Sequence, residues 1–267
     1  MREKNTKPQR VWITGASSGI GEACAYQYAA RKATLILTSS SLQKLEPVAE
    51  KCRAMGAEVT LLPYDLRQLD GIGALVQDAW EKHGGIDILF CNAGVSQRTN
   101  IEETSMEVFH TLMDLNFFAP VEMAKAILPL MLANGGGHIA VTTSIAGRFG
   151  FPLRCGYSAS KHALYGFFET LQAEYTDKGI RTTIVCPGRV RTDISLNSLD
   201  KNGQRRGVMD PGQANGLSAE AAAKKIVRAI DKGKLEVLVG GKELVMVYIK
   251  RFFPGLCARL ARKIKPV

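Results

Sequence analysis

The chain alternates short apolar runs with longer stretches of helical spacing, and this alternation restricts its fold more than any other feature. Strands are expected at 11–15, 33–40, 58–66, 86–94, 138–144, 180–188 and 235–240. Apolar strands separated by helices of about 12–15 residues predict a parallel sheet covered by helices on both faces. Right-handed crossovers make such a sheet doubly wound. We therefore predict a single Rossmann-like α/β fold with a doubly wound parallel sheet of about seven strands.

The intervening helices are expected at 19–32, 42–55, 69–83, 105–132, 157–178 and 218–230. Pro120 and Pro129 are expected to kink or break the fourth helix, because proline removes a helical hydrogen bond. Gly179 is expected to close the fifth helix. The side chain of Ser218 is expected to cap the sixth.

The first strand runs into the glycine-rich turn TGASSGIG, Thr14 to Gly21. Gly15 permits the tight turn, Gly19 lets the backbone approach a pyrophosphate, and Gly21 allows close packing of helix on strand. The N-terminus of the next helix offers free N–H groups and a positive dipole end to phosphates. The turn therefore predicts a dinucleotide site where the carboxyl ends of the strands converge.

A second pattern, YSASK, places Tyr157 and Lys161 one helical turn apart, with Ser144 thirteen residues before the tyrosine. Tyrosine and lysine at this spacing project on the same face of a helix. A free phenol has a pKa near ~10, so general base catalysis at neutral pH needs a nearby positive charge to lower it. The three side chains suit the transfer of a hydride and a proton between a nicotinamide and a carbonyl or alcohol.

Six motifs in the same order closely resemble the short-chain dehydrogenase/reductase family over about residues 10–240. They are TGASSGIG, CNAG (91–94), Asn116, Ser144, YSASK and PGRVRT (187–192). The family usually has a second asparagine at the position of Cys91. The resemblance implies an NAD(P)-dependent enzyme that interconverts a carbonyl and a secondary alcohol. It also implies Asn116, Ser144, Tyr157 and Lys161 as catalytic residues, with Tyr157 as general acid and base.

The resemblance also implies a set of cofactor contacts. Asn92 to Gly94 match the segment beside the adenosine ribose, Asp65 the residue near the adenine, and Thr192 the residue at the nicotinamide carboxamide. The expected cofactor-binding residues are Gly15, Ser17, Ser18, Gly19, Ile20, Gly21, Ser39, Ser40, Asp65, Leu66, Asn92, Ala93, Gly94, Tyr157, Lys161, Pro187, Gly188, Val190 and Thr192.

The turn after the second strand bears on the choice of cofactor. An acid there favours NAD and an arginine favours NADP. This chain has Ser39, Ser40 and Ser41 with Lys44 one turn later, and no carboxylate that would repel a phosphate. NADP(H) is therefore favoured, and NAD(H) remains open.

The formal charge of +10 is concentrated at the two ends of the chain. Residues 1–10 supply +3 and residues 242–267 supply +6. A nucleic-acid binder would carry its basic stripe on the folded body, so this nearly neutral body argues against nucleic acid as a partner. We predict a catalytic domain at 1–241 and a basic amphipathic extension at 242–267.

The extension is expected to form a helix from Pro254, on which Leu256, Leu260 and Ile264 recur every four residues. Such a helix suits an anionic membrane surface. The alternative is that its apolar side packs on the body or on a partner subunit. Similar tails in family members that act on lipid-like or steroid-like substrates favour an apolar substrate by analogy.

The remaining features fit a cytoplasmic enzyme. The six cysteines show no CxxC spacing, so they are expected to be reduced thiols without a metal site. No secretory signal and no run of about 18 apolar residues is visible. We expect a cytoplasmic homodimer or tetramer, peripheral at a membrane if the extension binds one. A 3-oxoacyl carrier-protein reductase and a non-catalytic cofactor-binding regulatory protein are the alternatives.

Overall fold

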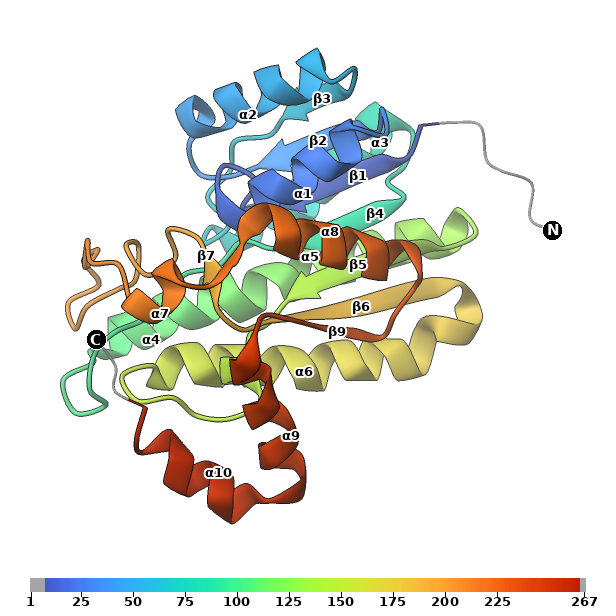
Figure 1. Cartoon of the computed structure of the whole chain (residues 1–267). Coiled ribbons are helices and arrows are strands. Elements are labelled where there is room, and N and C mark those ends of the chain that lie inside the picture. Colours follow the sequence, from blue (N-terminus) through green and yellow to red (C-terminus); the bar gives the residue numbers. More distant parts are fainter. Residues whose placement is uncertain (1–7, 265–267) are drawn as a thin grey trace.

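The computed structural model describes residues 8–264, and its centre is a parallel sheet (Figure 1). Its strands are β1 Arg10–Thr14, β2 Thr34–Thr38, β3 Glu58–Leu61, β4 Ile88–Cys91, β5 Gly137–Thr142, β6 Ile180–Pro187 and β9 Glu236–Val239. Their order is β3-β2-β1-β4-β5-β6-β9, and every pairing is parallel. The predicted seven-stranded doubly wound sheet is thus confirmed. The strand order reverses between β1 and β4, where open α/β sheets place their ligand crevice.

Two helix layers cover the sheet. One consists of α1 Gly19–Ala29, α2 Leu42–Ala54 and α8 Ala219–Asp231, and the other of α3 Ile72–His83, α5 Ala119–Ala133 and α6 Cys155–Tyr175. The remaining elements are α4 Met106–Met113, α7 Pro211–Ala214, α9 Val245–Phe252, α10 Pro254–Ala261, the short pair β7 Val190–Arg191 and β8 Leu217–Ser218, and the single turns η1 Leu69–Gly71, η2 Asp114–Phe118, η3 Ile145–Gly147, η4 Thr176–Lys178 and η5 Lys242–Leu244.

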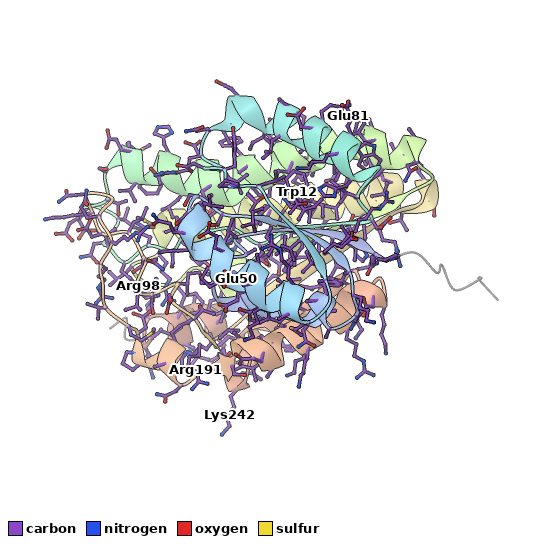
Figure 2. The ribbon with its side chains drawn as sticks, turned by 90° about the horizontal axis from the view of Figure 1, so that it is seen from above. Trp12, Glu50, Glu81, Arg98, Arg191 and Lys242 are labelled. Atoms are coloured by element: carbon purple, nitrogen blue, oxygen red, sulfur yellow. The ribbon has the colours of Figure 1, made fainter. Side chains whose placement is uncertain are left out.

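Alternation along each strand divides the core into two apolar layers. Val11 and Ile13 of β1 pack towards α1 and α8, while Trp12 between them packs towards α3 and α5. Trp12 is completely buried and donates its indole N–H to Thr38 Oγ1 at 2.9 Å. Figure 2 shows Trp12 in the interior and Glu50 and Glu81 on the outer helices. Burial on both faces explains why the central strands are mainly apolar.

Several strands are shorter than the apolar runs predicted. β3 ends at Leu61 instead of residue 66, and β4 ends at Cys91 instead of residue 94. Their last residues leave the sheet ladder and become loops at its carboxyl edge. Two end signals are confirmed: Gly179 has a φ of 86°, and Ser218 Oγ accepts the N–H of Ala221 at 3.2 Å.

The prediction for the fourth helix was partly wrong. The helical stretch from Met106 to Ala133 is not broken at Pro129, which lies inside α5. Its irregularity is the π-helical turn at 114–118, directly before Pro120. Pro120 has no N–H to donate to the preceding turn, so the backbone relaxes to wider spacing ahead of it. This turn carries Asn116.

By length and composition, this compound helix at 106–133 is also the one stretch within residues 8–264 that could cross a membrane. No such stretch was expected from the sequence. Many of its apolar residues, including Val108, Leu112, Met123 and Ile127, are buried within the protein. It lies against α3 and α6, as a core helix does.

The C-terminal segment folds back against the body. α9 and α10 form a helical pair below α6 in Figure 1. Met246, Val247, Ile249, Cys257 and Ile264 pack against the core layer of α6. The charges of residues 1–7 and Lys265, on which the charge argument partly depended, lie outside the described residues.

Candidate active site

A cavity of about 1260 Å³ opens along the carboxyl edge of the sheet. Loops after β1, β2, β3, β4, β5 and β6 line it, together with part of residues 193–217. All the predicted catalytic and cofactor-binding residues except Gly21 and Asn116 are among its lining residues. Residues more than 170 positions apart in the sequence therefore meet in one cleft.

The glycine turn has the geometry that a close approach of backbone requires. Gly15 has a φ of +62°, which side chains other than glycine rarely adopt. A Cβ on Gly21 would collide with the carbonyl oxygen of Gly15, so the first turn of α1 packs directly on the end of β1. The free N–H groups at the start of α1 border the cleft through Ser18 and Gly19. This cradle fits a pyrophosphate.

Hydrogen bonds around Asn92 fix the strand ends on which the cradle sits. Thr14 Oγ1 accepts from the backbone N–H of Asn92 at 3.0 Å and of Ala93 at 3.1 Å. The Asn92 side chain donates to Thr14 O at 3.2 Å and accepts from Thr142 Oγ1 at 3.0 Å. One asparagine thus ties β1, β4 and β5 together at the switch point.

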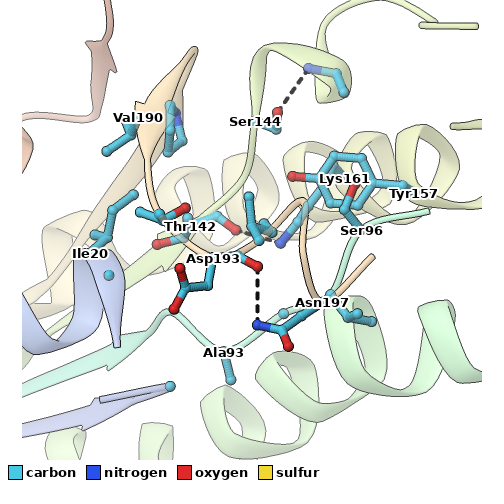
Figure 3. A pocket seen from close by; sticks show the side chains of 18 of the residues that line it. Ile20, Ala93, Ser96, Thr142, Ser144, Tyr157, Lys161, Val190, Asp193 and Asn197 are labelled. Carbon is cyan, nitrogen blue, oxygen red and sulfur yellow. Dashed lines mark hydrogen bonds between the residues drawn. The ribbon is translucent and has the colours of Figure 1, made fainter. Parts of the chain in front are cut away.

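Tyr157 and Ser144 lie side by side in the cleft (Figure 3). Tyr157 is on the first turn of α6 and only 7% exposed, and Ser144 follows β5 and caps η3 by accepting the Ala146 N–H at 3.1 Å. Burial raises the pKa of the Tyr157 phenol above its ordinary value of 10. Hydrogen bonding by Ser144 and the positive charges of Arg154 and Arg98 act in the opposite direction.

Lys161 is buried beside them, with its Nζ 6.0 Å from the centre of the Tyr157 ring. Its ammonium donates to Thr142 O at 2.8 Å. Burial lowers the pKa of Lys161 from 10.5 to about 7. Arg154 and Arg98, two charges to which the sequence did not point, favour the phenolate of Tyr157. The predicted part of Lys161 in stabilising the phenolate stays a prediction.

Asn116 lies behind the cleft and is completely buried. Its Oδ1 accepts from Val95 N at 2.9 Å, and its Nδ2 donates to Val95 O at 2.9 Å and to Ser160 Oγ at 3.1 Å. The side chain therefore fastens the loop after β4 to α6. The expected part of Asn116 in a proton relay stays a prediction.

Gln97 supports the start of α6 and was missed from the sequence. It is completely buried, and its Oε1 accepts the N–H groups of Gly156 at 2.9 Å and Tyr157 at 3.3 Å. The helix therefore receives its N-terminal cap from a residue 60 positions earlier in the chain. The sequence gives no sign that Gln97 caps this helix, because helix caps are ordinarily Ser, Thr, Asp or Asn residues at the helix start itself.

The end of the cleft after β2 and β3 carries Ser39, Ser40 and Lys44 as predicted. Ser39 Oγ accepts from Ser41 N at 3.3 Å, and Ser41 Oγ caps α2 by accepting from Lys44 N at 3.4 Å. Arg67, which the sequence analysis did not single out, also lines this end. Its guanidinium holds Asp65, with Nη2 at 2.5 Å from Oδ2, and so neutralises the predicted adenine-side carboxylate.

The opposite end of the cleft, beyond Tyr157, combines apolar walls with arginines. The apolar lining residues there are Leu115, Phe149, Phe151, Pro152, Leu199, Met246 and Ile264. Met246 and Ile264 belong to the C-terminal extension, which therefore takes part in the cleft. Arg98, Arg154 and Arg205 line the same end. Within residues 8–264, no group of three His, Cys, Asp or Glu side chains is placed to hold a metal ion.

A doubly wound sheet with a glycine cradle at its switch point defines a dinucleotide-binding α/β protein. Residues 9–203 match the short chain dehydrogenase family. The chain belongs to this family, and it is an oxidoreductase that acts on CH–OH groups with a nicotinamide cofactor.

The relatives that match nearly the whole chain include two from a fish and an insect. Dehydrogenase/reductase SDR family member 7B of Danio rerio is 35% identical over 266 residues, covering 97% of this chain and 86% of the relative. Dehydrogenase/reductase SDR family protein 7-like of Drosophila melanogaster is 35% identical over 259 residues, covering 95% and 79%.

Solved structures of similar proteins contain either nicotinamide cofactor. A short chain dehydrogenase/reductase from Burkholderia phymatum, in complex with NAD, has a TM-score of 0.83 and 25% identity, covering 95% of this chain and 96% of that one. A metagenomic short-chain oxidoreductase in complex with NADP has a TM-score of 0.72 and 27% identity, covering 86% and 96%.

Proposed function

We propose that the protein interconverts a carbonyl and a secondary alcohol by hydride transfer, with Tyr157 as general acid and base. The observation that carries the proposal is the convergence of Tyr157, Ser144 and Lys161 in the cleft that also holds the glycine cradle. The cofactor supplies or receives the hydride when bound. The remaining steps fall to the side chains.

In the direction of reduction, the phenol of Tyr157 gives its proton to the carbonyl oxygen, and in oxidation the phenolate takes the proton from the alcohol. Ser144, beside it, holds the same oxygen by a hydrogen bond. Because Tyr157 is buried, its proton is shielded from water. The charges of Arg154, Arg98 and protonated Lys161 stabilise the phenolate that remains after transfer.

The decisive experiment compares Tyr157→Phe with Tyr165→Phe. Both remove one hydroxyl from α6, but Tyr165 lies outside the cleft and bonds Thr143 and Glu236 instead. A panel of ketones, aldehydes and secondary alcohols is assayed by NADPH oxidation or NADP⁺ reduction. We expect Tyr157→Phe to lose roughly 10²- to 10⁴-fold in kcat while still binding cofactor. Retention of more than about a tenth of the wild-type kcat would refute the role of Tyr157.

The preferred cofactor is proposed to be NADP(H). Ser39, Ser40 and Lys44 line the end of the cleft after β2 without a carboxylate among them. Asp65 at this end is paired with Arg67, so its carboxylate is neutralised. A 2′-phosphate at this end would meet Lys44 and hydroxyls.

The substrate is proposed to have an apolar part. Phe149, Phe151 and Pro152 form one wall beyond Tyr157, and Met246 and Ile264 of the C-terminal extension add to it. An aliphatic or ring-shaped substrate would bury its surface there.

The extension is further proposed to contact an anionic membrane surface. Its inner side packs on the body, but Tyr248, Phe252 and Phe253 are 56–65% exposed on α9 and at its end. Exposed basic side chains accompany them: Lys250, Arg251, Arg259, Arg262 and Lys263. Exposed aromatics flanked by cations suit the boundary between lipid headgroups and acyl chains.

Co-sedimentation with vesicles tests this contact. The paired change Phe252→Ser and Phe253→Ser is compared with Ile101→Ser and Met106→Ser, two apolar residues elsewhere that are similarly exposed, at 71% and 61%. Wild type and the second pair should bind anionic vesicles, less at high salt, and the first pair should not. Absence of binding by the wild type would leave packing on the body as the only role of the extension. Cytoplasmic location and assembly as a homodimer or tetramer stay predictions.

A further inference from the structure

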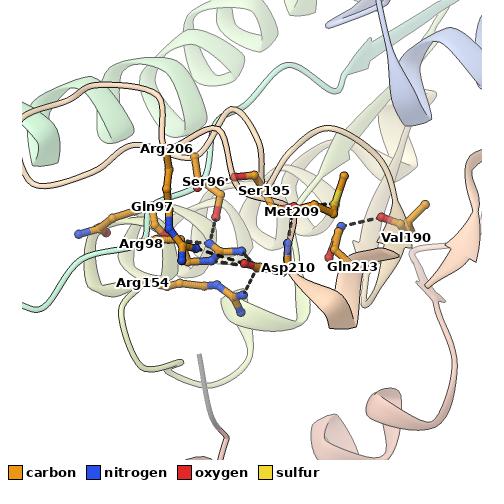
Figure 4. A network of polar contacts seen from close by, with 11 residues as sticks. Ser96, Gln97, Arg98, Arg154, Val190, Ser195, Arg206, Met209, Asp210 and Gln213 are labelled. Carbon is orange, nitrogen blue, oxygen red and sulfur yellow. Dashed lines mark hydrogen bonds and ion pairs between the residues drawn. The ribbon is translucent and has the colours of Figure 1, made fainter. Parts of the chain in front are cut away.

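One buried carboxylate beside the cleft is surrounded by three guanidinium groups (Figure 4). Asp210 accepts from Arg98 Nε at 3.0 Å and from Arg154 Nη2 at 3.1 Å, and Arg206 Nη1 lies 3.4 Å from its other oxygen. Arg98 and Arg154 share this one carboxylate, so these three residues alone leave one excess positive charge. Excess charge in a buried setting is costly unless an anion joins it.

Arg98 and Arg154 differ in how many of their N–H groups are hydrogen-bonded. Arg98 also donates to Ser96 Oγ at 2.7 Å and to Gln97 O at 2.6 Å, so it is anchored on several sides. The guanidinium of Arg154 makes a single hydrogen bond within residues 8–264, the one to Asp210, and its Nε is buried without a partner. Arg154 rests against the ring of Phe151, at 5.1 Å from its centre. This contact orients its planar group but uses none of its N–H groups.

Arg154 lies close to the reacting groups. It immediately precedes α6, three residues before Tyr157, and both residues line the cleft. Its charge acts on the Tyr157 phenol, as that of Arg98 does. Arg205 lines the same end of the cleft, and its side chain has no hydrogen-bond or ion-pair partner in the described part of the chain. Guanidinium groups bind phosphate and carboxylate in a bidentate manner.

We infer that Arg154, assisted by Arg205, binds an anionic group, a phosphate or a carboxylate, that the substrate carries near its reacting carbonyl. The inference rests on the proposed function, because Tyr157 marks the position of that carbonyl. Together with the wall of Phe149, Phe151 and Pro152, it assigns an amphiphilic substrate with an acidic group close to the reacting carbon and an apolar remainder.

The competing explanation is purely structural. The same network fastens residues 193–217 to the loop after β4, where Arg98 N donates to Leu199 O at 2.9 Å and Leu199 N donates to Ser96 O at 2.9 Å. If Arg154 did nothing more than this, neutral and anionic substrates would bind alike.

The test uses three methyl ketones of equal length that end in a phosphate ester, a carboxylate or a hydroxyl two carbons from the carbonyl. Their Kd values are measured on Tyr157→Phe saturated with NADP⁺, so that turnover and the phosphate sites of the cofactor do not interfere. The same Kd values are measured on three double variants, in which Arg154→Met, Arg154→Lys or Arg191→Met is combined with Tyr157→Phe. Arg191 is an exposed arginine near the cleft that does not line it, so it controls for loss of charge.

We expect at least one anionic ketone to bind roughly 10- to 100-fold more tightly than the hydroxyl ketone. Arg154→Met should remove the difference, Arg154→Lys should restore part of it, and Arg191→Met should keep it. The stronger of the two anions identifies the group. Equal binding of all three ketones, no binding of either anion, or equal losses in Arg154→Met and Arg191→Met would overturn the inference.

The comparison among ketones on one protein needs no Arg154 variant, so a variant that fails to fold does not block the test. Failure of the proposed function has a different signature. In that case the anionic ketones bind selectively, but wild-type protein reduces none of the three and the panel above yields no turnover.

Discussion

The two ends of the cleft are constructed in different ways. The nucleotide end consists of backbone: Gly15, Gly21 and the start of α1 lie within eight residues of one another and bring N–H groups to the surface. The substrate end consists of side chains from remote segments, including Arg98, Arg154 and Met246. The first can be recognised from a short motif, whereas the second can be recognised only after the chain has folded.

This difference has a consequence for mutation. A backbone cradle tolerates no added volume but depends little on particular side chains. A side-chain site tolerates changes in shape but loses its selectivity when a charge is removed. Tyr157 and Lys161 line the same cleft and are the residues proposed to act where its two ends meet.

The largest effect is expected for Gly21→Val. The new side chain would collide with the carbonyl of Gly15, so we expect a loss of roughly 3 kcal/mol or more in the free energy of unfolding and no measurable cofactor binding. Gly73→Ala is the control: nothing lies near a Cβ there, and it should stabilise α3 by about 0.5–1 kcal/mol. Urea unfolding and cofactor titration measure both. A stable Gly21→Val that binds cofactor would contradict the backbone account of the nucleotide end.

The next effect concerns Lys161 and pH. Burial lowers its pKa to about 7, whereas its ordinary value is 10.5. Between these values the unfolded chain binds a proton that the folded chain does not, so stability rises with pH. From about pH 7 to about pH 9 the cofactor-free protein should gain about 2–3 kcal/mol that Lys161→Met does not gain. Urea unfolding of wild type and Lys161→Met at the same pH values isolates the contribution of Lys161 to the free energy of unfolding. Identical slopes of this free energy against pH in the two proteins would rule the contribution out.

The smallest effect is expected for Ser39→Asp, which adds a charge at the nucleotide end without adding much volume. NADPH should bind wild type at least about tenfold more tightly than NADH, a difference of ~1.4 kcal/mol, and the substitution should invert the order. Ser39→Asn matches the shape without the charge and should keep the wild-type preference. Fluorescence titration measures the affinity of each protein for NADPH and NADH. Equal affinities of wild type for the two cofactors would remove the basis for the NADP assignment.

Much of the fold could be predicted because parallel strands carry their own signature. Strands buried on both faces must be apolar throughout, and seven such runs separated by helices leave few topologies. The strand ends were less predictable, as at Leu61 and Cys91, because an apolar residue looks the same in a ladder and in a loop that lines a cleft. The π-helical turn at 114–118 was also missed, since only the position of Pro120 hints at it.

The site could be predicted as far as its motifs are local. Glycine at 15, 19 and 21 is demanded by backbone geometry, and Tyr157 and Lys161 share a helix face by their spacing. No local sequence motif points to Gln97 or Asp210. A buried glutamine that caps a helix from 60 residues away, and a carboxylate that gathers three arginines, depend on which segments the fold brings together.

The sequence by itself determined the sheet, the glycine cradle and the family, because each depends on residue types at short, fixed spacings. Only the tertiary structure decided what surrounds Tyr157: which charges act on its phenol, which residues cap its helix, and that Met246 and Ile264 of the C-terminal segment line the substrate end. The physical reason is the range over which each effect acts along the chain. Backbone geometry is set within a few residues, whereas burial and electrostatics are set by whichever parts of the chain come within a few ångströms in space.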